Sequence, residues 1–230
     1  MKSLSLAPSR SQDSAQSGQT WGGSMYLAID TSAGTSVAIV DAGGVVRAER
    51  DSADTRKHAE VIGDFIHECL AEAAIAVTDL TSVVAGMGPG PFTGLRVGIV
   101  AARTFAFGAS LPVLAVVTHD AIALGESGPV LIATDARRKE YYWSTYEGSD
   151  AAGLPIRAHG PALAPIAELA AQVPDFERYT LRETAAVRAP RLAALAHLMV
   201  ANGREFAGQE ALYLRSPDVT PSAGPKRVTA

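Results

Sequence analysis

A short acidic and hydroxyl-rich segment is the first place where the residue types of this sequence could support chemistry. It reads Asp30-Thr31-Ser32-Ala33-Gly34-Thr35-Ser36 and lies between two apolar runs. A carboxylate at the end of a strand, followed by a turn rich in backbone N–H groups, can hold a phosphate and orient a metal-bound water. The same residues are also ordinary components of a hairpin turn, and the residues alone favour the hairpin.

A second glycine-rich segment, Gly-Pro-Gly-Pro-Phe-Thr-Gly, occupies residues 88–94. Glycine-rich turns at a helix N-terminus can bind anions, but two prolines remove two N–H donors. The spacing matches neither a P-loop nor the dinucleotide fingerprint. We therefore interpret the segment as a stiff connection from strand to helix, with Thr93 as the N-cap. Arg96 opposes the helix dipole, so we expect a carboxylate or a partner protein to hold it.

The histidines do not predict a metal site. His58 and Glu60 precede a helix, but a second ligand on the same helix face would have to stand four residues after His58. That residue is Ile62, and His67 falls on a different face. We expect a capping or surface role for His58 and no bound metal.

Nucleophilic catalysis is not indicated either. Cys69 falls in the apolar stripe of the same helix, which predicts a buried and inert thiol. There is no Gly-x-Ser-x-Gly segment, and the adjacency of His119 and Asp120 is no evidence of a catalytic triad. We assign no catalytic residue.

The elements that position these residues follow from hydrophobic periodicity. Three short apolar runs, over residues 25–29, 36–40 and 45–50, predict strands of an antiparallel meander. An amphipathic helix is expected over residues 57–73. The later pattern predicts strands over 82–85, 113–117, 130–133, 141–146 and 211–214, and helices over 95–109, 166–173 and 190–201. Residues 130–146 are expected to form a hairpin with a charged turn.

The helix over residues 95–109 is apolar around nearly its whole circumference. Only Arg96, Arg103 and Thr104 are polar. A helix that is apolar all round must be buried all round. The sheet can cover one side, so the other side needs a second cover, from this chain or from another.

Composition limits the classes of function. The net charge is -4, from 20 basic and 24 acidic residues, which argues against a chain that grips nucleic acid by itself. A single cysteine fits a reducing, cytoplasmic compartment, and no apolar run approaches the ~18 residues of a transmembrane helix. Residues 1–24 are rich in Ser, Gln and Gly, so we expect them to be disordered. Met25 is an alternative start, and residues 219–230 are expected to be a loose tail.

Several segments in one order resemble the TsaB family. They are residues 25–33, 57–60, 88–98 and 135–142, together with Tyr213-Leu214-Arg215. The resemblance covers about residues 25–218, and the segment 88–98 is its most diagnostic part. It implies an α/β, actin-like (ribonuclease H-like) fold of two related subdomains, 25–118 and 119–218, with mixed β-sheets flanked by helices.

The resemblance also implies a function without chemistry in this chain. Members of the family pair with TsaD, which places threonylcarbamoyl on N6 of the adenosine 3′ of the anticodon in tRNAs that read codons beginning with A. A TsaE ATPase joins them, tRNA is bound only through the complex, and ATP or ADP enters at the level of the complex. TsaD holds its metal through His-x-x-x-His, where this chain has His58 and Ile62. The resemblance therefore implies a cytoplasmic scaffold, a pseudoenzyme that can form a homodimer when isolated.

Two sets of site residues follow from this family. The two helices have more apolar surface than one sheet face can cover, and an interface of ~700–800 Å² per side would be standard. The candidate interface residues are Val61, Phe65, Leu95, Ile99, Arg103 and Phe107. The candidate residues of a vestigial nucleotide or phosphate loop are Asp30, Thr31, Ser32 and Gly34.

Three alternatives remain open at this point. The first is a stand-alone actin-fold ATPase or kinase that uses Asp30 and Gly34 with ATP and magnesium, although no second glycine-rich adenosine motif is clear in residues 120–230. The second is a peptidase, which lacks both a metal pair and a nucleophile motif. The third is an interaction module without a role in tRNA modification.

Overall fold

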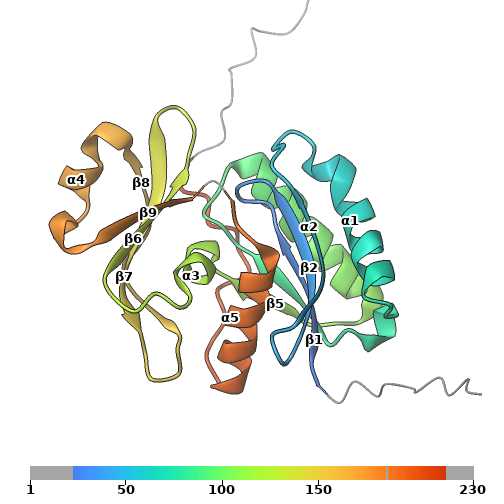
Figure 1. Cartoon of the computed structure of the whole chain (residues 1–230). Helices are drawn as coiled ribbons and strands as arrows, with labels where there is room; N and C mark the ends of the chain where they lie inside the picture. The colour runs from blue at the N-terminus through green and yellow to red at the C-terminus, as the bar shows by residue number, and fades with distance from the viewer. Residues whose placement is uncertain (1–22, 185, 216–230) are drawn as a thin grey trace, which may run out of the picture.

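The protein folds into two lobes, each built around one β-sheet (Figure 1). The computed structural model describes residues 23–184 and 186–215. We predicted a disordered segment over residues 1–24 and a loose tail over residues 219–230. Apart from Gly23 and Ser24, these residues lie outside the described part. Among the described residues, no helix combines the length and the apolar character needed to cross a membrane.

The first sheet is mixed and has five strands in the order β3-β2-β1-β4-β5. Its strands are β1 (Met25–Asp30), β2 (Thr35–Asp41), β3 (Val46–Ser52), β4 (Ser82–Gly86) and β5 (Val113–Val116). β1 pairs antiparallel with β2, and β2 with β3, which confirms the predicted meander. β4 pairs parallel with β1, and β5 pairs parallel with β4. The carboxyl ends of β1 and β4 therefore lie at one edge of the sheet, where the Asp30 segment begins.

Strand β1 is covered on both faces, and its side chains alternate between two cores. Met25, Leu27 and Ile29 pack with helices α1 (His58–Glu72) and α2 (Phe92–Ala109). Tyr26 and Ala28 pack on the opposite face with helix α5 (Ala189–Ala201). This position explains why the segment is a continuous apolar run rather than an alternating one.

Helices α1 and α2 lie side by side on one face of the first sheet (Figure 1). α1 confirms the amphipathic helix predicted over residues 57–73, and it buries Ile62, Ile66 and Cys69. α2 begins at Phe92, earlier than predicted, and its N-cap is Pro91. The prediction of Thr93 as N-cap is wrong, because the helix already includes Thr93 and the extended residue before it is a proline, which needs no N–H partner there.

The second sheet has four strands in the order β8-β7-β6-β9. They are β6 (Val130–Asp135), β7 (Glu140–Ser149), β8 (Pro155–Pro165) and β9 (Thr180–Thr184). β6 and β7 form the predicted hairpin, closed by a hydrogen bond of 2.9 Å from the N–H of Ala136 to the carbonyl of Glu140. β9 joins β6 in parallel. Each sheet thus combines an antiparallel meander with parallel pairing, to β4 and β5 in the first sheet and to β9 in the second.

The remaining elements are short, apart from α5. They are α3 (Thr118–Ala123), α4 (Leu169–Gln172) and the 3-10 turns η1 (Val77–Asp79), η2 (Ile166–Glu168) and η3 (Phe176–Arg178). The helix predicted over residues 166–173 is therefore only η2 followed by α4. The helix predicted over 190–201 is confirmed as α5.

The chain after residue 188 returns to the first lobe. α5 packs on β1 and β2, the N–H of Ala207 donates to the carbonyl of Ala115 at 3.0 Å, and the N–H of Leu212 donates to that of Met87 at 2.9 Å. Residues 211–214 form no strand, in contrast to the prediction. The division of the sequence at residue 118 stays a prediction, since residues after it complete the first lobe.

Candidate functional site

The carboxylate of Asp30 is buried at the end of β1 and fully engaged by the chain itself. Its Oδ1 accepts hydrogen bonds from the N–H of Ser32 at 2.8 Å and from the hydroxyl of Ser32 at 2.5 Å. Its Oδ2 accepts one from the hydroxyl of Thr118 at 2.7 Å. Thr118 in turn accepts a hydrogen bond from the N–H of Gly88 at 3.1 Å. Asp30 therefore ties its own turn to the glycine-rich segment and to α3.

The glycine-rich segment packs directly on the Asp30 turn. A Cβ at Gly94 would lie 2.7 Å from the carbonyl oxygen of Thr31, and a Cβ at Gly98 would overlap the Thr31 hydroxyl. That hydroxyl donates to the carbonyl of Gly94 at 2.7 Å and accepts the N–H of Gly98 at 3.1 Å. Only residues without a side chain allow this approach. The start of α2 therefore packs directly against Thr31 of the turn.

Burial governs the protonation of the two titratable groups here. Burial raises the pKa of Asp30, and hydrogen bonds from Ser32 and Thr118 and the charge of His58 oppose that rise. Burial lowers the pKa of His58, and the field of Asp30 opposes it. The Nδ1 of His58 lies 2.8 Å from the hydroxyl of Thr35. His58 is thus a buried hydrogen-bonding group that joins the start of α1 to the turn, rather than the capping or surface residue that we predicted.

One hollow borders part of this turn. It has a volume of about 220 Å³, and Gly34, Ser52 and Arg188 are among its lining residues. Asp30, Thr31 and Ser32 do not line it. The predicted phosphate-loop residues are adjacent in space, and Gly34 is the one of them that borders this hollow.

Neither a metal cluster nor an accessible thiol appears near α1. No group of three or more His, Cys, Asp or Glu side chains that could hold a metal occurs in residues 23–184 and 186–215. Ile62, where a second histidine would be needed, is buried in the first core. The thiol of Cys69 lies 3.6 Å from the carbonyl of Val37, and burial raises its pKa to about 11. It is a packing residue and not a nucleophile.

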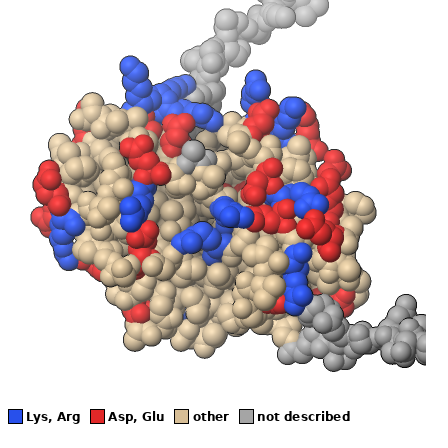
Figure 2. Space-filling model, in the orientation of Figure 1, with Lys and Arg blue, Asp and Glu red and all other residues tan. Residues whose placement is uncertain are grey.

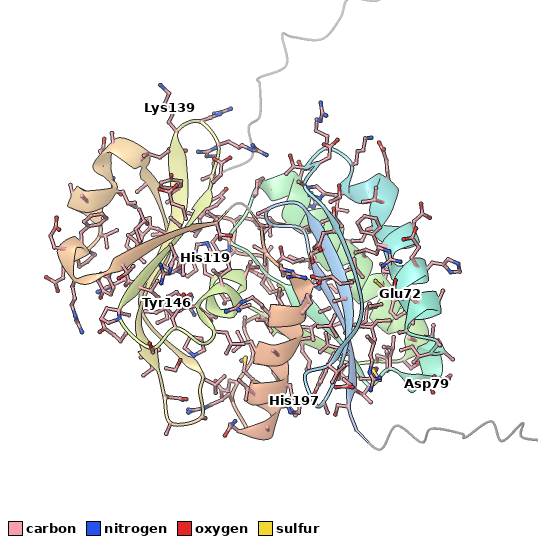
Figure 3. All side chains as sticks on the ribbon, in the orientation of Figure 1. Glu72, Asp79, His119, Lys139, Tyr146 and His197 are labelled. Carbon is pink, nitrogen blue, oxygen red and sulfur yellow. The ribbon has the colours of Figure 1, made fainter. Side chains whose placement is uncertain are left out.

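His119 and Asp120 contact different side chains of the second sheet; Figure 3 labels His119 and Tyr146 there. The Nδ1 of His119 lies 2.8 Å from the hydroxyl of Ser144, and its Nε2 lies 3.0 Å from that of Thr134. Asp120 instead accepts a hydrogen bond of 2.7 Å from the hydroxyl of Tyr146. His119 has no exposed surface, so no substrate can reach this imidazole.

The outer face of α2 carries exposed residues spaced three or four apart, which places them on one side of the helix. Phe107 is 88% exposed and Val100 is 55% exposed. We call this face the α2 stripe; its members are Thr93, Arg96, Val100, Arg103, Thr104 and Phe107. We predicted that α2 is covered on every side, by this chain or by another. This chain covers only part of the helix and leaves the two large apolar side chains of Val100 and Phe107 exposed.

The six predicted interface residues occupy different environments. Arg103 and Phe107 belong to the α2 stripe. Leu95 and Ile99 are 0% and 4% exposed within the first core. Ile99 also borders a hollow beside the α2 stripe, together with Arg96 and Val100. Contact of these two residues with a partner stays a prediction. The other two are half-buried residues of α1, Val61 and Phe65.

The segment after α5 borders the α2 stripe, which the sequence pattern did not predict. The ring of Tyr213 lies 4.7 Å from that of Phe92, and the guanidinium of Arg103 donates to the carbonyl of Gln209. Helix and segment together line a hollow of about 310 Å³. The guanidinium of Arg96 lies over the Phe92 ring, 5.2 Å from its centroid. Within this chain an aromatic face therefore holds Arg96, whereas we predicted a carboxylate or a partner protein; contact with a partner stays a prediction.

Comparisons of the sequence with known proteins agree on one group of relatives. The model of the family described as "TsaD: tRNA N6-adenosine threonylcarbamoyltransferase" matches residues 38–212. An uncharacterized protein of Mycobacterium tuberculosis is 42% identical over 149 residues, which are 61% of this chain and 71% of that protein. The tRNA threonylcarbamoyladenosine biosynthesis protein TsaB of Escherichia coli is 36% identical over 126 residues, which are 53% of this chain and 54% of TsaB. The match therefore spans about half the length of TsaB.

Among solved structures, YeaZ from Pseudomonas aeruginosa is similar over its whole chain. The TM-score is 0.67 and the identity 28%, and the match covers 83% of this chain and 100% of YeaZ. A second Pseudomonas aeruginosa structure, described as similar to the peptidase YeaZ, gives a TM-score of 0.68 at 29% identity. These likenesses confirm the predicted α/β fold of two lobes with mixed sheets.

Proposed function

This chain belongs to the TsaB family, with the actin-like fold predicted for it, and from this premise we propose that it is the non-catalytic subunit of the complex that places threonylcarbamoyl on N6 of the adenosine 3′ of the anticodon. It binds and supports a TsaD-like catalytic subunit. A TsaE-like ATPase joins the pair, and tRNA is modified by the assembled complex.

The α2 stripe carries this proposal. Phe107 and Val100 are large apolar side chains left in water on a regular helix. Arg96 and Arg103 flank Val100 on the same face. Aromatic residues and arginine are the types most enriched in the cores of protein interfaces. A partner helix that covers Val100 and Phe107 would complete the apolar cover of α2.

The closed Asp30 turn supports the absence of catalysis in this chain. Both carboxylate oxygens of Asp30 accept hydrogen bonds from Ser32 and Thr118. A carboxylate that orients a metal-bound water needs at least one oxygen directed at the ligand. Opening this turn would break three hydrogen bonds and expose the packed glycines. The chemistry therefore belongs to the partner subunit.

The same stripe pairs two copies of the chain when the catalytic subunit is absent. Both assemblies compete for Phe107 and Val100, so addition of the catalytic subunit converts the homodimer into a heterodimer. Light scattering of the isolated chain and of the mixture measures this exchange directly.

The test combines reconstitution with a matched pair of variants. The chain is mixed with the TsaD-like and TsaE-like proteins of its own organism, an unmodified tRNA transcript and the threonylcarbamoyl donor. Val100 on α2 and Val200 on α5 are 55% and 50% exposed. We expect Val100→Asp to prevent co-purification and transfer, because it places an unpaired charge in a desolvated interface, and Val200→Asp to leave both intact. Transfer by this chain alone would refute the scaffold role, and full binding by a folded Val100→Asp variant would refute the interface.

A further inference from the structure

Two positively charged turns, one from each lobe, meet at one end of the molecule. The first comprises residues 54–57, immediately before α1, and the second residues 135–140, which connect β6 to β7. The guanidinium of Arg137 donates a hydrogen bond of 2.9 Å to the hydroxyl of Thr55 and so joins them. Figure 2 shows cationic side chains projecting at this end, and Figure 3 labels Lys139 there. We call these two turns the basic end.

The basic end holds more cations than carboxylates. Its cations are Arg56, Lys57, Arg137, Arg138 and Lys139, and its carboxylates are Asp54, Asp135 and Glu140. Arg56 pairs with Asp54 at 3.1 Å, and Arg137 with Asp135 at 3.2 Å. Glu140 pairs with Arg215, which comes from the segment after α5. All three carboxylates are therefore already matched by arginines, in a chain whose net charge is -4.

The backbone of the second turn is unusual for its residue types. Arg137, Arg138 and Lys139 have φ angles of 65°, 54° and 62°, a left-handed region that non-glycine residues rarely enter and almost never in succession. The N–H of Arg137 donates to Asp135 at 2.7 Å, and the carbonyl of Ala136 accepts from Arg215 at 3.1 Å.

No burial offsets the cost of this backbone conformation, because all three side chains are exposed. Hydrogen bonds hold it instead: the carbonyl of Arg137 accepts from the N–H of Glu140 at 3.0 Å, and that of Lys139 from the N–H of Ile166 at 2.9 Å. Backbone strain of this kind occurs most often at functional sites. Its effect here is to present three consecutive cations to solvent beside Arg56 and Lys57.

We propose that the basic end binds the phosphate backbone of RNA, and that this chain thereby supplies part of the RNA-binding surface of the complex; the inference rests on the proposed function. Closely spaced Lys and Arg side chains in water match a polyanion, and phosphate contacts need no base recognition. Five exposed cations are too few for a chain of negative net charge to hold RNA firmly by itself. The basic end extends a surface whose remainder lies on the catalytic subunit.

The experiment uses the full chain in complex with its catalytic subunit. Binding of a fluorescein-labelled, unmodified tRNA transcript is followed by anisotropy at several KCl concentrations. The double variant Lys57→Glu/Lys139→Glu changes one residue in each turn. The control, Arg178→Glu/Arg204→Glu, makes the same change in charge at two exposed residues outside the basic end, whose partners are Glu147 and Asp150. Thermal unfolding checks that both variants fold.

We expect the basic-end variant to bind tRNA at least about tenfold more weakly, and the logarithmic salt slope to fall by roughly 1.5, because each phosphate contact contributes about 0.7–0.9. The control should stay within about twofold of the wild type. Unchanged tRNA binding by the basic-end variant, in a complex that transfers threonylcarbamoyl normally, would overturn the inference and leave the proposed function intact. Loss of catalytic-subunit binding instead would identify the basic end as a protein interface and also overturn it. If the wild-type chain neither assembles nor supports transfer, the proposed function fails and this inference fails with it.

Discussion

Replacement of Phe107 by alanine separates binding from folding more sharply than any other change in the α2 stripe. The Phe107 side chain is 88% exposed, so it contributes little to the folded state of the isolated chain. Burying a phenylalanine side chain that was in water gains about 1.5–3 kcal/mol of transfer free energy. If a partner covers it, Phe107→Ala should weaken the complex by about that amount, which is roughly a 10- to 100-fold rise in Kd.

The effect on the stability of the isolated chain should be much smaller. Surface substitutions away from special contacts usually change the free energy of unfolding by less than about 0.5 kcal/mol, which is a shift of about 1–2 °C in Tm for a chain of this size. The assay is therefore a pair of measurements on one variant: titration calorimetry with the catalytic subunit, and thermal unfolding without it. A Kd equal to that of the wild type would show that the partner does not cover Phe107. A large fall in Tm would show that the side chain packs within its own chain, and either result would refute the reasoning.

Two further predictions concern the interior. Gly98→Ala should lower the free energy of unfolding by about 1–3 kcal/mol, because the new Cβ overlaps the Thr31 hydroxyl. Gly108→Ala lies in the same helix with nothing within 4 Å of the new Cβ, so it should raise the free energy of unfolding by up to about 1 kcal/mol. Urea unfolding of both variants should give shifts of opposite sign. Burial lowers the pKa of His119 from 6.5 to about 3. Between these two pH values the folded state binds fewer protons than the unfolded state. The free energy of unfolding should therefore fall as the pH drops from 6.5 to about 3, by up to about 1.4 kcal/mol per pH unit. His119→Gln should flatten the acid limb of the stability curve and His67→Gln, at an exposed residue, should not; parallel curves for the wild type and His119→Gln would show that His119 is not the group responsible.

The first lobe was predictable because its elements obey simple periodicity. β1 has apolar residues on both faces, and α1 buries Ile62, Ile66 and Cys69 at helical spacing. The second lobe was predicted less well. β8 contains three prolines and Gly160, and all but the last residue of β9 are exposed, so neither strand shows the alternation that identifies a strand. Pairing with β7 and β6 defines these strands, and pairing across the chain is invisible to a local pattern.

The exposed face of α2 was harder to predict than the helix itself. α2 is so rich in apolar residues that its apolar pattern alone does not define a buried face. Those at positions 96, 103 and 104 nevertheless lie on one side of the helix, and the structure places them with Val100 and Phe107 in the α2 stripe. Leu95 and Ile99 are buried in the first core, and Ile99 also borders the hollow beside the stripe. In a helix that is apolar nearly all round, the polar positions identify the exposed face better than the apolar positions identify the buried one.

The closed turn and the exposed stripe have one structural cause. Gly94 and Gly98 let the first two turns of α2 approach Thr31, and this approach brings Leu95 and Ile99 onto the sheet with the glycines. When that face of the helix is fixed against the Asp30 turn, helical geometry directs residues 96, 100, 103 and 107 to the opposite side. A larger residue at position 98 would therefore open the turn and rotate or displace the stripe at the same time. The glycines that pack α2 onto the Asp30 turn are thus the same residues that set the orientation of the α2 stripe.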